Sequence, residues 1–263
     1  MAKLCTLASS SSGNSTYLES RSTSILIDAG ISCRRLCSCL TELNCEESAL
    51  KGVLITHEHS DHISGLCNFL KKFNIPVYST SLVLDELLKK DCVNEDMIRE
   101  ISYDKPFSID DMEIEAFKTP HDSVDSVGFR INTPDEHSFG VATDMGKICE
   151  NVLTALKGCE TVILEANYDP DLLRMGNYPY FLKQRIISAN GHLPNEESGK
   201  MALNLFDNGT MHFILAHLSK HNNTPSLAYQ TVEDCFTNHG AYIHTDYELT
   251  VAPYDTMSPI MRR

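Results

Sequence analysis

Short apolar runs separated by polar turns predict strands and helices along the first half of the chain. The runs KLCTLAS and NSTYLES flank the turn SSSSGN, and the apolar run SILIDAG carries Asp28 near its end. An amphipathic helix is predicted from about Cys33 to Leu43 and a strand from Gly52 to Thr56. Ser60 is the candidate N-cap of a helix through HISGLCNFLKKF.

The same alternation continues to the end of the chain. Strand-like pieces MEIEAFKTPH, SVGFRINT and HSFGVATD precede a helix near ICENVLTALKG and the strand ETVILEAN. A basic helical segment, YPYFLKQRIISAN, a helix in PNEESGKMALNLFDN, the strand MHFILAH and a last helix in PSLAYQTVEDCFTNH follow. Since no linker, low-complexity tract or repeat interrupts this pattern, we expect one layered α/β (α+β) domain over residues 1–263.

Composition and charge exclude some classes of protein. With 263 residues, 42% of them hydrophobic, the chain can bury a substantial core. A formal net charge of −14 argues against a protein that coats nucleic acid by bulk electrostatics. It leaves room for an enzyme that contacts a few phosphates. Neither a signal-like start nor a long apolar run is present, so we expect a cytoplasmic protein with no membrane partner.

Ten cysteines raise the question of disulfides or a sulfur-bound metal. In a chain of this size without a signal we expect reduced thiols, mostly small core residues. The cluster of Cys33, Cys37, Cys39 and Cys45 could hold a metal, but its spacing matches no paired CxxC ribbon, and a periodic helix accounts for most of it.

The segment HEHSDH, directly after the apolar run VLIT, concentrates metal-binding chemistry. His57 and His59 lie two residues apart, so in an extended loop both project to the same side. Asp61 and His62 follow where the chain turns into a helix and can face a second ion. The simpler alternative is a solvated polar loop. Three histidines and one aspartate at this spacing favour a metal site.

The motif THEHSDH resembles the HxHxDH signature of the metallo-β-lactamase superfamily, whose fold is a four-layer αβ/βα sandwich around a dinuclear metal site. Candidate residues for its other motifs occur in the expected order. The resemblance implies one ion on His57, His59 and His121, a second on Asp61, His62 and His217, a bridging Asp144, and Asp28 supporting the metal loop. Two divalent ions are implied, with zinc or manganese expected and iron compatible.

Four further stretches, LASSSSGNSTYL, LEANYD, LKQRIISANGHLPNE and HLSKHNNTP, resemble the YycJ/WalJ-like proteins of that superfamily. This resemblance implies 5′-to-3′ exonuclease action on DNA. Two other hypotheses stay open: a small-molecule hydrolase such as a cyclic phosphodiesterase, and a metal-bound scaffold without turnover. A narrow pocket would favour the small-molecule hydrolase. DNA is the expected substrate, and protein partners stay unknown.

By position, His192 is the candidate proton donor, with Glu165 as the residue that orients it. In this hypothesis a hydroxide that bridges the ions attacks phosphorus. Asp61 is a candidate both as a metal ligand and as a catalytic residue. Candidate substrate contacts are Ser12, Asn14, Lys183, Arg185, Ser188, Asn190 and Asn223. A solvated helix face, a flexible turn and Asx turns are equally good explanations for these residues. A nuclease of this charge also predicts that basic residues share one face, with Arg34, Arg35, Lys71, Lys72, Arg174, Lys183, Arg185 and Lys200 as candidates.

Overall fold

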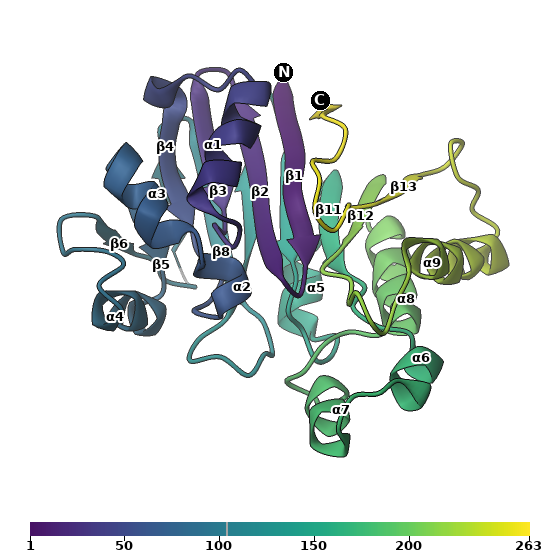
Figure 1. Cartoon of the computed structure of the whole chain (residues 1–263). Helices are drawn as coiled ribbons and strands as arrows, with labels where there is room; N and C mark the ends of the chain where they lie inside the picture. Colours follow the sequence, from purple (N-terminus) through teal and green to yellow (C-terminus); the bar gives the residue numbers. More distant parts are fainter. Residues whose placement is uncertain (104) are drawn as a thin grey trace.

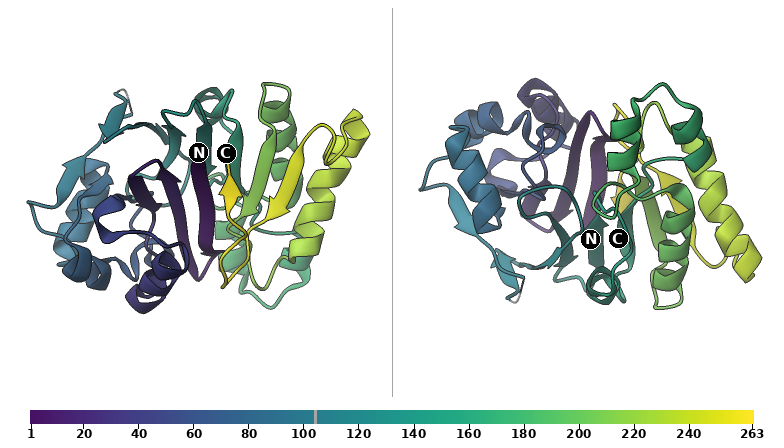
Figure 2. Two further views of the ribbon diagram at one scale, coloured as in Figure 1. Left: turned by 90° about the horizontal axis from the view of Figure 1, so that it is seen from above. Right: turned by 90° about the horizontal axis from the view of Figure 1, so that it is seen from below.

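Two seven-stranded sheets packed face to face, with helices on both outer surfaces, make up the fold (Figure 1). The structure is a computed structural model that describes residues 1–103 and 105–263. Seen from above and from below, the N-terminal and C-terminal halves of the chain lie side by side, and both chain ends lie between them (Figure 2). The predicted four-layer αβ/βα sandwich is confirmed.

The first sheet has the strand order β14-β1-β2-β3-β4-β5-β6. Its strands are β1 (Ala2–Ser10), β2 (Gly13–Ser20), β3 (Thr23–Ile27), β4 (Leu50–Leu54), β5 (Val77–Ser79), β6 (Ile98–Glu100) and β14 (Met261–Arg262). The pairs from β14 to β3 are antiparallel, and those from β3 to β6 are parallel.

The second sheet has the order β13-β12-β11-β10-β9-β8-β7. Its strands are β7 (Phe107–Ile109), β8 (Met112–Lys118), β9 (Val127–Asn132), β10 (Ser138–Ala142), β11 (Thr161–Glu165), β12 (His212–Ala216) and β13 (Glu248–Val251). Here too an antiparallel part, β7 to β10, continues into a parallel part, β10 to β13.

The helices divide between the two outer faces and one edge. The first half contains α1 (Cys33–Glu42), a 3-10 turn (Glu47–Ala49), α2 (Ser60–Ile63), α3 (Leu66–Phe73) and α4 (Ser81–Lys89). The second half contains α5 (Glu150–Leu156), α8 (Asn195–Phe206) and α9 (Pro225–His239), with α6 (Pro170–Met175) and α7 (Tyr180–Ile186) projecting at the lower right of Figure 1.

Alternating side chains along the central strands produce the four layers, because successive residues of a strand point to opposite faces. In β3, Leu26 packs beneath the helices of the first half, whereas Ile25 faces the other sheet. In β11, Val162 and Leu164 pack beneath the helices of the second half, and Ile163 lies between the sheets. Both central strands are therefore buried on two faces.

The helix predicted after the metal loop is in fact two helices, and Ser60 is not its N-cap. His59 occupies the N-cap position of α2, and the helix is interrupted at Gly65 before α3 begins. A Cβ atom at Gly65 would lie 1.8 Å from the carbonyl oxygen of Ile31, so the break lets the chain pass close to its neighbour. The strand predicted to reach Thr56 ends earlier, since the Thr56 N–H donates to Asp28 Oδ1.

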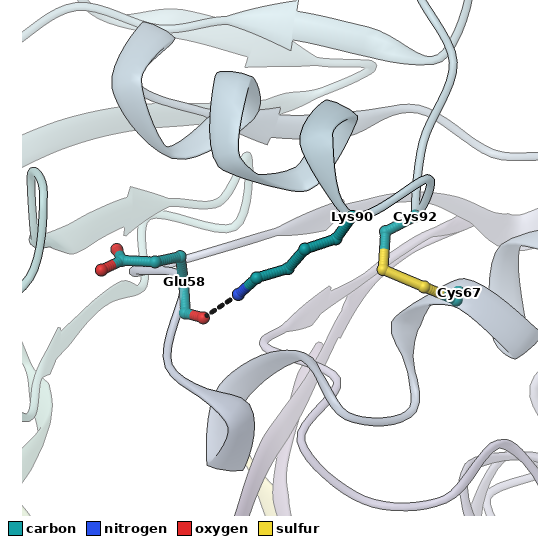
Figure 3. Close-up of a disulfide and its surroundings, with 4 residues drawn as sticks. All are labelled: Glu58, Cys67, Lys90 and Cys92. Carbon is teal, nitrogen blue, oxygen red and sulfur yellow. Dashed lines mark hydrogen bonds between the residues drawn. A yellow bond between two sulfur atoms is a disulfide. The ribbon is translucent and has the colours of Figure 1, made fainter.

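The expectation that all cysteines are reduced thiols is wrong for one pair. Cys67 of α3 and Cys92, in the turn after α4, form a disulfide, because these elements bring their Cα atoms to 4.4 Å (Figure 3). Next to it, Lys90 Nζ donates to the carbonyl oxygen of Glu58 in the metal loop at 3.0 Å (Figure 3). The disulfide thus links α3, which follows the metal loop, to the turn after α4, whose Lys90 contacts that loop.

The other cysteine cluster does not form a four-cysteine site. Cys33 and Cys37 approach to 4.0 Å between sulfurs on α1, whereas Cys39 is buried in the core beneath that helix and Cys45 Sγ donates to Ser24. Among the described residues, no helix is long and apolar enough to cross a membrane.

Candidate metal centre

The candidate metal ligands and their neighbours gather where the central strands end. Residues at or just beyond strand ends are Asp28 (β3), His57 (β4), His121 (β8), Asp144 (β10), Glu165 (β11) and His217 (β12). Since parallel strands end at the same edge, this topology brings them together. Asp28, Asp144 and His217 have φ angles of 62°, 59° and 56°, a left-handed conformation that is uncommon for residues other than glycine.

Three imidazole nitrogens form the first half of the centre. His59 Nδ1 lies 3.1 Å from His57 Nε2 and 3.2 Å from His121 Nε2. A tetrahedral site with Zn–N bonds of about 2.0–2.1 Å has ligand separations of roughly 3.3 Å, so the spacing fits one ion. Burial lowers the pKa of His57 and of His121. Both rings are therefore neutral near pH 7, with a lone pair available for a cation.

Hydrogen bonds on the far side of the rings fix which nitrogen faces the centre. His57 Nδ1 lies 3.0 Å from Thr56 Oγ1, and His121 Nδ1 lies 3.0 Å from the carbonyl oxygen of Gly191. The carbonyl accepts only from a protonated Nδ1, which leaves His121 Nε2 unprotonated toward His59. This orientation by an outer partner is usual for histidines that bind metals.

Asp61, His62 and His217 form the second half. Asp61 Oδ2 lies 3.3 Å from His217 Nε2 and 3.5 Å from His62 Nε2. Each ring has a buried carboxylate behind it: Asp28 Oδ2 lies 2.7 Å from His62 Nδ1, and Glu165 Oε1 lies 3.0 Å from His217 Nδ1. The two histidines are thus oriented alike, with Nε2 toward the centre.

Asp144 lies between the two halves. Its Oδ1 is 3.6 Å from His121 Nε2, and its Oδ2 is 3.2 Å from His62 Nε2. Despite this proximity, Oδ2 is buried without a hydrogen-bond partner among the described residues. Burial alone would raise the pKa of Asp144, but His217 and His62 hold it well below its usual range. An ionised, buried and unpartnered carboxylate oxygen is expected where a cation binds.

The charges of the histidines and carboxylates at the centre also favour a bound cation. Burial works against a charged ring at His62 and His217, but nearby carboxylates outweigh it. Asp28 and Asp144 raise the pKa of His62, and Asp144, Asp61 and Glu165 raise that of His217 to about 10. Without a cation, the negative charge of these carboxylates keeps both rings protonated. A divalent ion takes the place of such protons, so the donor set and its charge fit a divalent metal site.

His192 sits beside the centre with a different environment. Its Nδ1 lies 2.8 Å from Glu165 Oε1, and its ring centre lies 5.2 Å from those of His121 and His217. Its side chain is 20% exposed, whereas that of His217 is buried. It lines a cavity of about 210 Å³ together with Asp122 and Arg185. His192 therefore faces the space from which a substrate can approach.

The predicted substrate contacts divide into those near the centre and those away from it. Asn14 Nδ2 lies 3.1 Å from His62 Nε2 and 3.3 Å from Asp61 Oδ2, at the metal centre itself. Arg185 is ion-paired with Asp122 at the rim. Ser12 is exposed at the tip of the β1–β2 turn.

Of the other four predicted contacts, two donate to nearby carbonyl oxygens and a third lines a cavity. Lys183 Nζ donates to the carbonyl oxygen of Arg174, and the Ser188 hydroxyl donates to that of Arg185. Asn190 lines a second cavity, of about 490 Å³, on the His121 side.

Asn223 does not reach the site. Its amide is buried and bonds to Asn195 and to the carbonyl oxygen of Ala166, so its polar atoms already have protein partners. The predicted basic face is also wrong: Arg34, Arg35, Lys71 and Lys72 lie on α1 and α3, and Lys200 lies on α8 beyond the opposite sheet.

Several residues at the centre were not singled out from the sequence. They are Ser11, which lines the His192 cavity, Thr56 behind His57, Asp122 at the rim, and Asn167, whose Nδ2 donates to the His217 carbonyl at 2.8 Å. Thr56 and Asp122 directly adjoin predicted ligands, and that adjacency is the signal that could have found them.

Comparisons with known proteins agree with this geometry. A family model described as a Beta-lactamase superfamily domain matches residues 23–217. The exodeoxyribonuclease WalJ of Streptococcus pneumoniae is 34% identical over 98% of this chain and 97% of its own, and the exodeoxyribonuclease YycJ of Bacillus anthracis is 30% identical over 92% of each. The metallo-β-lactamase fold protein YhfI of Bacillus subtilis shares the fold, with a TM-score of 0.75, 18% identity and 98% coverage of both chains. The chain belongs to the β-lactamase superfamily and is similar over nearly its whole length to the WalJ and YycJ exodeoxyribonucleases.

Proposed function

We propose that this protein is a two-metal exodeoxyribonuclease that degrades DNA from the 5′ end in the cytoplasm, acting as a single domain. The observation that carries the proposal is the position of Asp144, whose oxygens lie within 3.6 Å of His121 in the first group of candidate ligands and of His62 in the second. The proposal is also supported by the WalJ and YycJ relatives, which match nearly the whole chain and are named exodeoxyribonucleases.

The proposed ligands follow from the atoms that face the centre: His57, His59 and His121 for one ion, Asp61, His62 and His217 for the other, with Asp144 shared. Zinc, manganese and iron all suit histidine and carboxylate donors. When bound, two such ions supply hydroxide near neutral pH and neutralise charge on a phosphate.

The chain's own residues supply proton transfer and orientation. His192 delivers a proton to the departing oxygen through Nε2, because its Nδ1 faces Glu165 at 2.8 Å. Glu165 thereby holds His192 and His217 in a fixed relation to each other. Asn14, Arg185 and Asn190 lie where they can contact phosphate or sugar oxygens. Two cavities adjoin the centre, one lined by His121 and Asn190 and the other by His192 and Arg185, and together they suit a chain substrate better than a mononucleotide.

Metal-dependent degradation of duplex DNA tests the proposal. Purified protein loaded with manganese or zinc is compared with Asp61→Ala, which removes a proposed ligand, and with Asp111→Ala, an exposed aspartate in the β7–β8 turn. We expect mononucleotide release from wild type and Asp111→Ala only. Hydrolysis of a cyclic mononucleotide without any DNA degradation would instead identify a small-molecule phosphodiesterase.

A further inference from the structure

Exposed apolar side chains concentrate in one short segment around α7. In the described chain this segment contributes Met175 (69% exposed), Tyr180 (77%), Phe181 (74%) and Ile187 (49%). Isolated exposed apolar residues are ordinary, but a group of them next to a functional site marks a binding surface. We call Tyr180 and Phe181 the aromatic pair.

The aromatic pair is not left over from a poorly packed helix. On the opposite face of α7, Ile186 is buried with Tyr168 and Leu173, and Leu182 packs against the same group. The helix is therefore anchored by one face while the other presents two rings to solvent. Exposed aromatic rings on an anchored helix are typical of a surface that binds another molecule.

The segment around α7 contains basic residues but no acidic ones. The chain contains 36 acidic residues among 263, yet none occurs from Met175 to Pro194, where Lys183 and Arg185 are the charged residues. On a chain of net charge −14, an acid-free stretch with two basic residues repels a polyanion less than the acidic parts of the surface do.

The segment is attached directly to the candidate reaction site. The His192 N–H donates to the carbonyl oxygen of Ile186 at 2.9 Å, and Leu182, Arg185 and Ile186 line the same cavity as His192. Arg185 is paired with Asp122, the residue after the candidate ligand His121. A strand whose phosphate reaches the metal centre therefore passes α7.

We propose that α7 is a stacking platform on which Tyr180 and Phe181 bind the unpaired bases of the DNA strand next to the metal centre. This inference rests on the proposed nuclease function and names a subsite for it. Stacking on exposed rings tolerates any base, which suits an enzyme that must advance along all sequences. The absence of acidic residues from Met175 to Pro194 favours nucleic acid over a partner protein.

A direct test uses the absence of tryptophan from the chain. Phe181→Trp introduces a single tryptophan, which can be excited selectively, into the platform of the metal-loaded protein. We expect a nuclease-resistant phosphorothioate oligothymidylate to quench its emission and polyphosphate of equal charge to leave it unchanged. Equal responses to both, or a response only to vesicles of anionic phospholipid, would overturn the platform.

A kinetic test separates this inference from the proposed function. Replacement of both rings by alanine should raise KM for DNA with a single-stranded end about five- to 150-fold, while hydrolysis of bis(p-nitrophenyl) phosphate stays unchanged. Tyr242→Ala, at a ring that is 59% exposed elsewhere, is the matched control. Unchanged KM for DNA in the double variant would refute the platform alone. Failure of wild type to degrade DNA would refute the nuclease.

Discussion

Glu165 is the residue whose replacement tests the construction of the centre most sharply. It ends β11, is fully buried, and accepts hydrogen bonds from four donors. Oε1 lies 2.8 Å from His192 Nδ1 and 3.0 Å from His217 Nδ1, and Oε2 accepts from the N–H groups of Met145 at 2.7 Å and Leu193 at 3.2 Å. Glu165→Gln keeps the shape of the side chain but removes its charge and one accepting oxygen.

The expected magnitude follows from these four contacts. An amide offers one oxygen, so two of the four donors face an NH₂ group and lose their acceptor. At about 1.5–3 kcal/mol for each hydrogen bond to a charged group, the upper bound is roughly 3–6 kcal/mol, which ring rotation partly relieves. Because His217 also loses its orienting partner, we expect metal affinity to fall about 10- to 100-fold, or roughly 1.4–2.7 kcal/mol.

Competition with a chromophoric chelator measures the metal affinity, and urea unfolding of the metal-free protein measures the stability. Glu160→Gln is the matched control, since Glu160 precedes the same strand and pairs with His137 at 2.6 Å at its other end. It should bind metal as wild type does. If Glu165→Gln also bound metal with wild-type affinity, the orienting role of this carboxylate would be wrong.

Three further outcomes are expected. Gly30→Ala should abolish tight metal binding, measured by metal content after gel filtration, because its Cβ would lie 1.6 Å from the Asp61 carbonyl oxygen; retained metal would contradict this. Cys92→Ser should lower the free energy of unfolding by about 2–4 kcal/mol in oxidising buffer, and reductant should do the same to wild type but not to the variant. Asp122→Asn should lose at most about 1 kcal/mol at neutral pH, since the pair with Arg185 is partly exposed. Burial alone would raise the pKa of Asp122, but Arg185 lowers it overall, so this difference in urea stability should disappear as the pH falls through the lowered pKa and should persist above it.

The sequence was most informative where a local pattern carries the chemistry. Apolar runs predicted the central strands, and the resemblance to the family motifs implied the residues gathered at their ends, from Asp28 to His217. The family and the sandwich fold were predicted from the same motifs and are confirmed. His192 and Glu165 were paired by position alone, and their atoms lie 2.8 Å apart.

The sequence was least informative where tertiary contacts decide. Asn223 follows a predicted ligand segment, but only the fold reveals that Asn195 and Ala166 take up its amide. The cysteines of the disulfide are separated by 25 residues, and their pairing depends on how α3 meets the turn after α4. Whether basic residues share a face depends likewise on which sheet each helix covers.

The most direct test of the central claim is a time course on duplex DNA whose two ends carry different labels on the same strand. With metal-loaded protein, we expect labelled mononucleotide to appear first from the 5′ end and the 3′ label to stay on long fragments until late. Release from the 3′ end first, or internal cuts that free both labels together, would contradict a 5′-to-3′ exodeoxyribonuclease.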